Sequence, residues 1–191
     1  PLPQFRDKYV DTTKSHLIVR VYSAKDNQGQ HYRVMLQPAP APPSSGPEGR
    51  AEDRLASTSL TIIKGIGRKT AALLQQTGGV DSVETFLEAG ATSAGRATLT
   101  RQTGKPKHVI LRWVQLADLM RIGGIGEDYS MLLWQTGITA IPELGNQNPQ
   151  ALETLLENFN QRRKVVNRLP SSEQIRDWVA QAQRLPPVVK T

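Results

Sequence analysis

The chain has 191 residues, and its 24 Lys and Arg against 17 Asp and Glu give a formal net charge of +7 at pH 7. It contains no cysteine, which excludes disulfides, thiolate zinc sites and iron–sulfur clusters and fits a reducing compartment. No apolar run approaches the roughly 18 residues of a membrane span, and no secretory signal is visible. We therefore expect a cytoplasmic protein without a membrane span.

The positive charge is concentrated in the middle of the chain. Residues 59–112 carry eight basic and three acidic residues, or +5, whereas residues 1–58 carry +2 and residues 113–191 carry eight of each. A local basic patch is typical of proteins that bind a polyanion. It also fits a basic scaffold protein bound to acidic protein subunits.

The N-terminal segment, residues 1–37, predicts a β-hairpin. Residues 17–23 and 31–36 alternate apolar and polar side chains, and residues 26–29 supply a turn. A lone hairpin is marginal in water, so we expect it to pack on the rest of the chain or to dock on a partner. Residues 38–57 are rich in Pro, Ser and Gly and predict a linker.

An internal repeat organises the remainder, residues 58–187, which reads as all helix. Residues 63–74 return as residues 122–133, and subtracting 65 from 124 gives a period of 59 for about nine identities. Such self-similarity at a fixed period marks a repeated structural unit. Each copy reads as a short helix, a Gly-Ile-Gly turn and a second helix, and we place the repeats at about 59–118 and 119–185.

Further helices follow each turn. Caps and breakers predict one from Asp81 to Gly90, with Glu84 completing the cap, and one from Ser93 to Gly104. Others begin at Pro106, at Asn148-Pro149 (ending before Pro170) and at Ser171-Ser172. Trp113-Val114 with Ala117 matches Trp178-Val179 with Ala182 at an offset of 65. We expect both tryptophans in the core.

The first glycine turn has the chemistry of an anion site. The turn leaves N–H groups unpaired at the start of the next helix, where the helix dipole favours negative charge. It resembles the helix-hairpin-helix motif, whose Gly-hydrophobic-Gly turn contacts nucleic-acid phosphates in many DNA-binding proteins. The alternative is a helical corner used only for packing. The candidate phosphate-binding residues are Lys64, Gly65, Gly67, Arg68, Lys69, Thr70, Arg101, Lys105 and Lys107.

The second turn, with Gly124 and Gly126, predicts a structural role. Glu127 and Asp128 follow it directly, and acidic residues complement a helix N-terminus. Their carboxylates would fill the anion site and repel phosphate. The two copies therefore divide into one that is able to bind an anion and one that is structural.

Residues 59–185 closely resemble a bacterial family known as domain of unknown function 4332. The motifs that carry the resemblance include residues 64–67, 86–92, 117–122, 124–126, 168–171 and 177–182. The resemblance implies a mainly α fold, a tandem helix-hairpin-helix domain of two pseudo-repeats, here preceded by the small β-hairpin and the Pro-rich linker. It implies little about activity. Members are frequent in cyanobacteria, which makes a photosynthetic assembly one possible setting.

An enzyme is not expected. Residues 65–71 resemble the hairpin of the endonuclease-III-type DNA glycosylases, in which the lysine at the position of Lys69 forms a Schiff base. Those enzymes need an aspartate roughly eighteen residues later, where this chain has Leu87-Glu88, and they carry cluster cysteines that are missing here. The histidines His16, His31 and His108 are scattered, so no metal set and no cofactor is expected.

Two functions remain open from the sequence. In the first, a non-enzymatic module grips the nucleic-acid backbone without reading sequence. In the second, the chain is an adaptor in a large protein assembly, with an antenna or photosystem as one setting, and its hairpin and tether reach across acidic subunits. The clustered charge at the glycine turn favours the first, and the lone β-hairpin favours the second.

Overall fold

The structure is a computed structural model that describes residues 22–25, 31–34 and 51–190. The chain divides into two compact units, Pro1–Pro47 and Glu48–Thr191. In the first unit, strand β1 (Tyr22–Lys25) pairs antiparallel with β2 (His31–Val34), with Tyr22 opposite Val34. The remainder of the expected strands, the turn at 26–29 and linker residues 38–50 lie outside the described residues.

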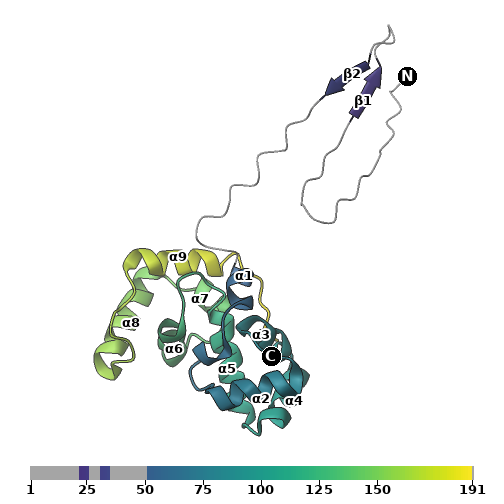
Figure 1. Cartoon of the computed structure of the whole chain (residues 1–191). Helices are drawn as coiled ribbons and strands as arrows, with labels where there is room; N and C mark the ends of the chain where they lie inside the picture. Colours follow the sequence, from purple (N-terminus) through teal and green to yellow (C-terminus); the bar gives the residue numbers. More distant parts are fainter. Residues whose placement is uncertain (1–21, 26–30, 35–50, 191) are drawn as a thin grey trace. The chain divides into compact units, whose positions relative to one another are not determined.

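The second unit is built of helices (Figure 1), which confirms the expected mainly α fold. Their bounds are α1 Ala51–Ala56, the 3-10 helix η1 Leu60–Ile62, α2 Arg68–Gly78, α3 Val83–Gly90, α4 Ser93–Thr103, α5 Lys107–Leu119, α6 Glu127–Gln135, α7 Ile141–Gly145, α8 Pro149–Arg163 and α9 Ser172–Ala182. The first glycine turn thus follows only one turn of 3-10 helix, whereas the second follows the long helix α5.

Helix α1 lies inside the segment that we predicted as linker, so the end of that linker at residue 57 was wrong. Two contacts explain the helix. Leu55 is buried in the first hydrophobic cluster, and the Arg54 guanidinium donates to the carbonyls of Met120 and Ile122 at 3.0 and 3.1 Å. The Pro, Ser and Gly content of the segment suggested a tether. It could not reveal the helix, because the partners of Arg54 lie more than sixty residues away in the sequence.

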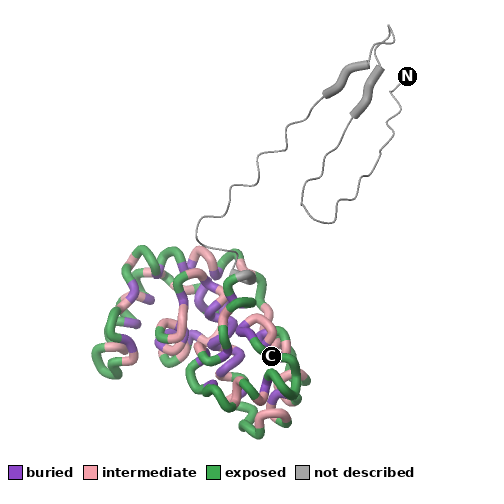
Figure 2. Tube along the Cα trace, in the orientation of Figure 1, coloured by how far each residue is buried: buried purple, intermediate pink, exposed green. Residues whose placement is uncertain are grey.

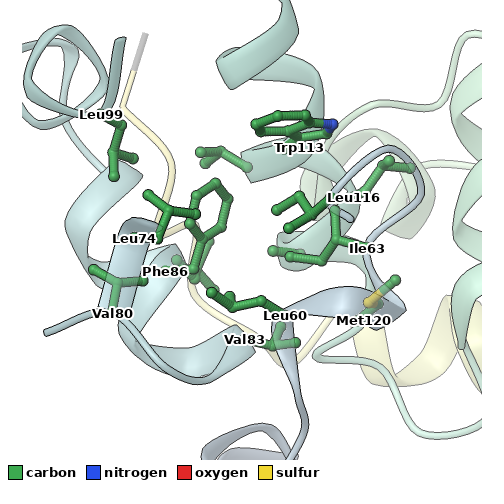
Figure 3. Close-up of a cluster of buried hydrophobic side chains, with 14 of the residues drawn as sticks. Leu60, Ile63, Leu74, Val80, Val83, Phe86, Leu99, Trp113, Leu116 and Met120 are labelled. Carbon is green, nitrogen blue, oxygen red and sulfur yellow. The ribbon is translucent and has the colours of Figure 1, made fainter. Parts of the chain in front are cut away.

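The first hydrophobic cluster collects side chains from α1 to α5. Figure 3 shows Leu74, Phe86, Leu99 and Trp113 within this cluster, with the indole nitrogen at its edge. Helix α3 is capped by Ser82, whose hydroxyl accepts from the Thr85 amide at 3.2 Å. The cap therefore lies one residue after the predicted Asp81, because Thr85 completes the reciprocal pair with Ser82.

The second hydrophobic cluster surrounds Trp178 and draws on α6 to α9 and on Leu119 at the end of α5. As expected, Trp113 and Trp178 are both core residues, 2% and 1% exposed. Helix α8 ends at Arg163, well before Pro170, because Lys164 caps it in the left-handed conformation with φ of 49°. Figure 2 shows exposed residues alternating with buried ones along this helix. Helix α7, which we did not predict, has a proline in its first turn.

The C-terminal segment ties the second repeat back to the first. The Lys190 amide donates to Ala91 O at 2.8 Å, and the Arg96 guanidinium donates to Lys190 O at 2.8 Å. Arg121 donates to Pro186 O at 3.0 Å. Val188 and Val189 pack against the first cluster. The two glycine turns are therefore held in one folded unit.

Candidate nucleic-acid interface at the glycine corners

The first glycine corner, residues 63–67, reverses the chain between η1 and α2. Gly65 has φ of +103°, a conformation that disfavours any residue with a Cβ. The Ile66 amide donates to Ile63 O at 2.9 Å, and the Ile66 side chain is buried. Gly67 is the N-cap of α2 and offers no side-chain acceptor, and the first turn holds no acidic residue. Among the residues that the structure describes, no carboxylate therefore caps the opening N–H groups of α2.

The second corner, residues 122–126, repeats this backbone. Gly124 has φ of +84°, and the Ile125 amide donates to Ile122 O at 3.1 Å. Gly126 is the N-cap of α6, again without a side-chain cap, but the first turn contains Glu127 and Asp128. The two helix starts have similar backbones and opposite charge. The expectation that the Glu127 and Asp128 carboxylates fill the second anion site was wrong, because no hydrogen bond among the described residues joins either carboxylate to the α6 N–H groups.

A tryptophan covers each corner. A Cβ at Gly65 would lie 2.7 Å from Trp113 Nε1, and a Cβ at Gly124 would lie 3.1 Å from Trp178 Nε1. Both repeats contain a tryptophan because, in each repeat, the indole packs against the glycine of that repeat's own corner. Among the described residues, the buried Trp113 Nε1 has no hydrogen-bond partner.

An ion pair joins the two corners. Lys64 Nζ lies 3.0 Å from Glu127 Oε1, with the side chains 55% and 40% exposed. The hydrogen bond to Glu127, followed by the attraction of its charge, raises the pKa of Lys64 above its ordinary value. Glu127 thus binds a side chain of the first corner, and Lys64 is not the free cation that we expected from the sequence.

The predicted phosphate-binding residues fall into two groups. Lys64 to Thr70 lie at the start of α2, where Arg68 and Lys69 are exposed. Arg101 and Lys105 lie near the other end of α2, because the neighbouring Gln102 donates to Thr77 O at 3.1 Å. Eleven helical residues separate the groups by about 15 Å. Lys107 begins α5, about two turns before the tryptophan that covers Gly65.

A hollow of about 440 Å³ lies beside the first corner and brings in two arginines that we did not predict as site residues. Its lining residues are Lys64, Gly65, Arg112, Asp128, Met131, Gln135, Arg163 and Val165. Arg112 is adjacent in sequence to the covering tryptophan. Arg163 comes from the second repeat, whose net charge of zero gave no reason to look for a cation there.

A known family model matches most of the helical unit. No helix among residues 51–190 combines the length and the apolarity needed to cross a bilayer. Comparison with curated proteins and with solved structures gives no match. The family model described as "Domain of unknown function (DUF4332)" matches residues 64–185, which span both glycine corners and both tryptophan helices. Since the match covers more than half of the chain, the protein belongs to this family.

Proposed function

We propose that the protein is a non-enzymatic module that binds the phosphate backbone of nucleic acid through its first glycine corner. One observation carries the proposal: the start of α2 has no acidic residue and no side-chain cap, and the exposed Arg68 and Lys69 flank it. A helix start of this kind attracts phosphate through its N–H groups and its dipole.

The second corner supports the proposal as an internal comparison. It has the same backbone, but Glu127 and Asp128 occupy the positions of Arg68 and Lys69. The first corner does not need the charges of Arg68 and Lys69 for packing, because both side chains are exposed. The cations at the first corner therefore favour a ligand that is negatively charged.

A binding role fits Lys69 better than a catalytic one. The side chain is exposed at the start of α2, and it does not line the hollow beside the first corner. A base-excising enzyme would need its nucleophile in a pocket that holds a flipped base. We accordingly expect no strand cleavage and no base release.

The test is retention of duplex DNA by the full chain at about 50 mM salt. Neutralising roughly three phosphates should give a slope near −3 for log K against log salt. Arg68→Glu with Lys69→Glu should abolish retention and leave helicity unchanged, whereas Glu127→Lys should not weaken it. Arg176→Glu with Arg184→Glu, on and just after α9, is the control because it changes the net charge equally at exposed positions. Equal losses in both double variants would contradict a site at the first corner.

The adaptor function is the second candidate, and the separate N-terminal unit favours it. A two-stranded hairpin such as β1–β2 is marginally stable alone, and its open edges suit pairing with a partner's sheet. Absence of DNA retention by the wild-type chain, together with a protein that copurifies in constant ratio, would replace the first proposal with this one.

A further inference from the structure

The hollow beside the first corner collects positive charge from three separate segments. Lys64 comes from the corner, Arg112 from α5 and Arg163 from the last turn of α8. Asp128 is the one carboxylate among the residues that line it. Lys64 is shared with Glu127 at 3.0 Å, but neither arginine has a described ion-pair partner. The lining therefore favours an anion.

Arg112 is held in place at this hollow. Its guanidinium carbon lies 5.8 Å from the centroid of the Trp134 ring, within the range of a cation–π contact. The indole is itself fixed, because Trp134 Nε1 donates to Gln115 Oε1 at 2.9 Å. A Cβ at Gly65 would lie 3.5 Å from Arg112 Nη2. The glycine thus leaves room for the guanidinium against the corner.

A buried donor of Arg112 is unpaired among the described residues. Its Nε is buried and makes no hydrogen bond to any of the residues described. Leaving a buried donor of a charged group unpaired is costly, and such groups in folded proteins call for a specific explanation. An oxyanion bound in the hollow would explain the unpaired donor, because a small rotation of the Arg112 guanidinium would let both Nε and Nη2 donate to that oxyanion.

The second corner provides a comparison within the same fold. A hollow of about 410 Å³ lies there, lined by Gly124, Gly126, Glu127, Asp128, Tyr129, Val166, Asn167 and Arg168. It has two carboxylates against one cation. The two hollows have nearly equal volumes and opposite charge, so the cations at the first are not a general property of a glycine corner.

We propose that the hollow beside the first corner binds the phosphate monoester group of a small molecule. A tetrahedral dianion presents oxygens in several directions, which suits Lys64, Arg112 and Arg163 better than a planar carboxylate that one guanidinium fork would saturate. The apolar parts of Met131 and Val165 and the amide of Gln135 are left for the attached group. The volume lies within the range of small-ligand pockets.

This hollow is distinct from the proposed nucleic-acid site at the start of α2. The N–H groups and the Arg68 and Lys69 side chains at the start of α2 would hold the nucleic acid, whereas neither side chain lines the hollow. Apart from Lys64 and Gly65, which belong to both sites, a small phosphate ester and a nucleic-acid backbone are therefore expected to depend on different residues. The two proposals can fail separately.

The experiment is calorimetric titration of the full chain with ribose 5-phosphate, with ribose as the ligand that lacks the phosphate. We expect saturable binding of one molecule per chain for the ester and none for ribose. Arg112→Gln and Arg163→Gln should each weaken binding by about tenfold, because each removes a charge-assisted hydrogen bond. Arg176→Gln, an exposed change of the same charge on α9, should leave binding unchanged.

Three outcomes would overturn the proposal: no saturable heat with ribose 5-phosphate, equal binding of ribose, or equal weakening by Arg176→Gln. Circular dichroism of each variant shows whether it folds. Arg163 is exposed at the end of α8, so Arg163→Gln keeps the test valid if Arg112→Gln does not fold. Lys69→Gln separates the two sites, since it should weaken DNA retention and leave ester binding unchanged.

Discussion

Lys64 Nζ and Glu127 Oε1 lie 3.0 Å apart, so a cation that precedes the first glycine turn is paired with an acid that follows the second. The pair links the two repeats at the place where their charges differ most. The pair also changes the charge at the first corner. Glu127 largely balances the charge of Lys64, so Arg68 and Lys69 remain as the cations nearest to the start of α2.

Glu127→Gln should strengthen DNA retention a few-fold at low salt. The change releases Lys64 to interact with phosphate and removes a negative charge near the first corner. Because both side chains are partly exposed, the gain should shrink as salt is raised. Retention against salt concentration measures it, with the exposed Glu173→Gln on α9 as the matched control. An unchanged or weaker retention for Glu127→Gln alone would contradict the masking of Lys64.

The corner glycines should differ in their tolerance of alanine. Gly65→Ala and Gly124→Ala place a Cβ at positive φ against a tryptophan nitrogen, and each should lower the free energy of unfolding by about 1–3 kcal/mol. Gly67→Ala should have a much smaller effect, since a Cβ there meets nothing within 4 Å. Chemical denaturation monitored by circular dichroism compares the three variants. Equal losses at Gly65 and Gly67 would contradict the proposed role of positive φ.

The sequence predicted those features of the fold that depend on nearby residues. The two Gly-Ile-Gly corners, the buried Trp113 and Trp178, and the caps Asn148 and Ser171 all have local signals of period, breaker or cap. These signals survive in the structure because short-range backbone geometry determines them.

Features that depend on distant partners were not predicted. Helix α1 is stabilised through Arg54, whose acceptors are Met120 and Ile122, and no local pattern reveals them. The hollow at the first corner could not be predicted for the same reason, because Arg163 reaches it from the other repeat. The charge counts assigned Arg163 to a different segment from Lys64 and Arg112, although the tertiary structure brings the three together.

Gly90→Ala should be among the most destabilising of the glycine substitutions. A Cβ at this position would overlap Val114 Cγ2 on α5, where α3 and α5 pack within the first cluster. Overpacking of this kind costs about 1–3 kcal/mol. The second change Val114→Ala removes the overlapping methyl groups, so the double variant should lose less stability than the two single losses combined. Strict additivity in denaturant unfolding would show that the two residues are not in contact.

Asp118 should give the stability a measurable pH dependence. The carboxyl group is buried at the end of α5, 2% exposed, and its Oδ1 accepts from Arg121 Nη1 at 3.0 Å. Burial raises the pKa of Asp118 above its usual value, and the hydrogen bond and charge of Arg121 offset part of that rise. The folded protein therefore holds this proton at a pH where the unfolded chain, with a pKa of about 3.9, has released it.

The sign follows from proton linkage. Since the folded state binds more protons, the contribution of Asp118 to stability is most favourable below the unfolded pKa and declines as the pH rises through the folded pKa. The difference in free energy of unfolding between wild type and Asp118→Asn should fall from pH 3 towards neutral pH and then level off. Urea denaturation at several pH values measures the difference, with the exposed Asp177→Asn on α9 as a control for loss of a carboxylate. A difference that rises with pH would mean that Arg121 outweighs burial at this position.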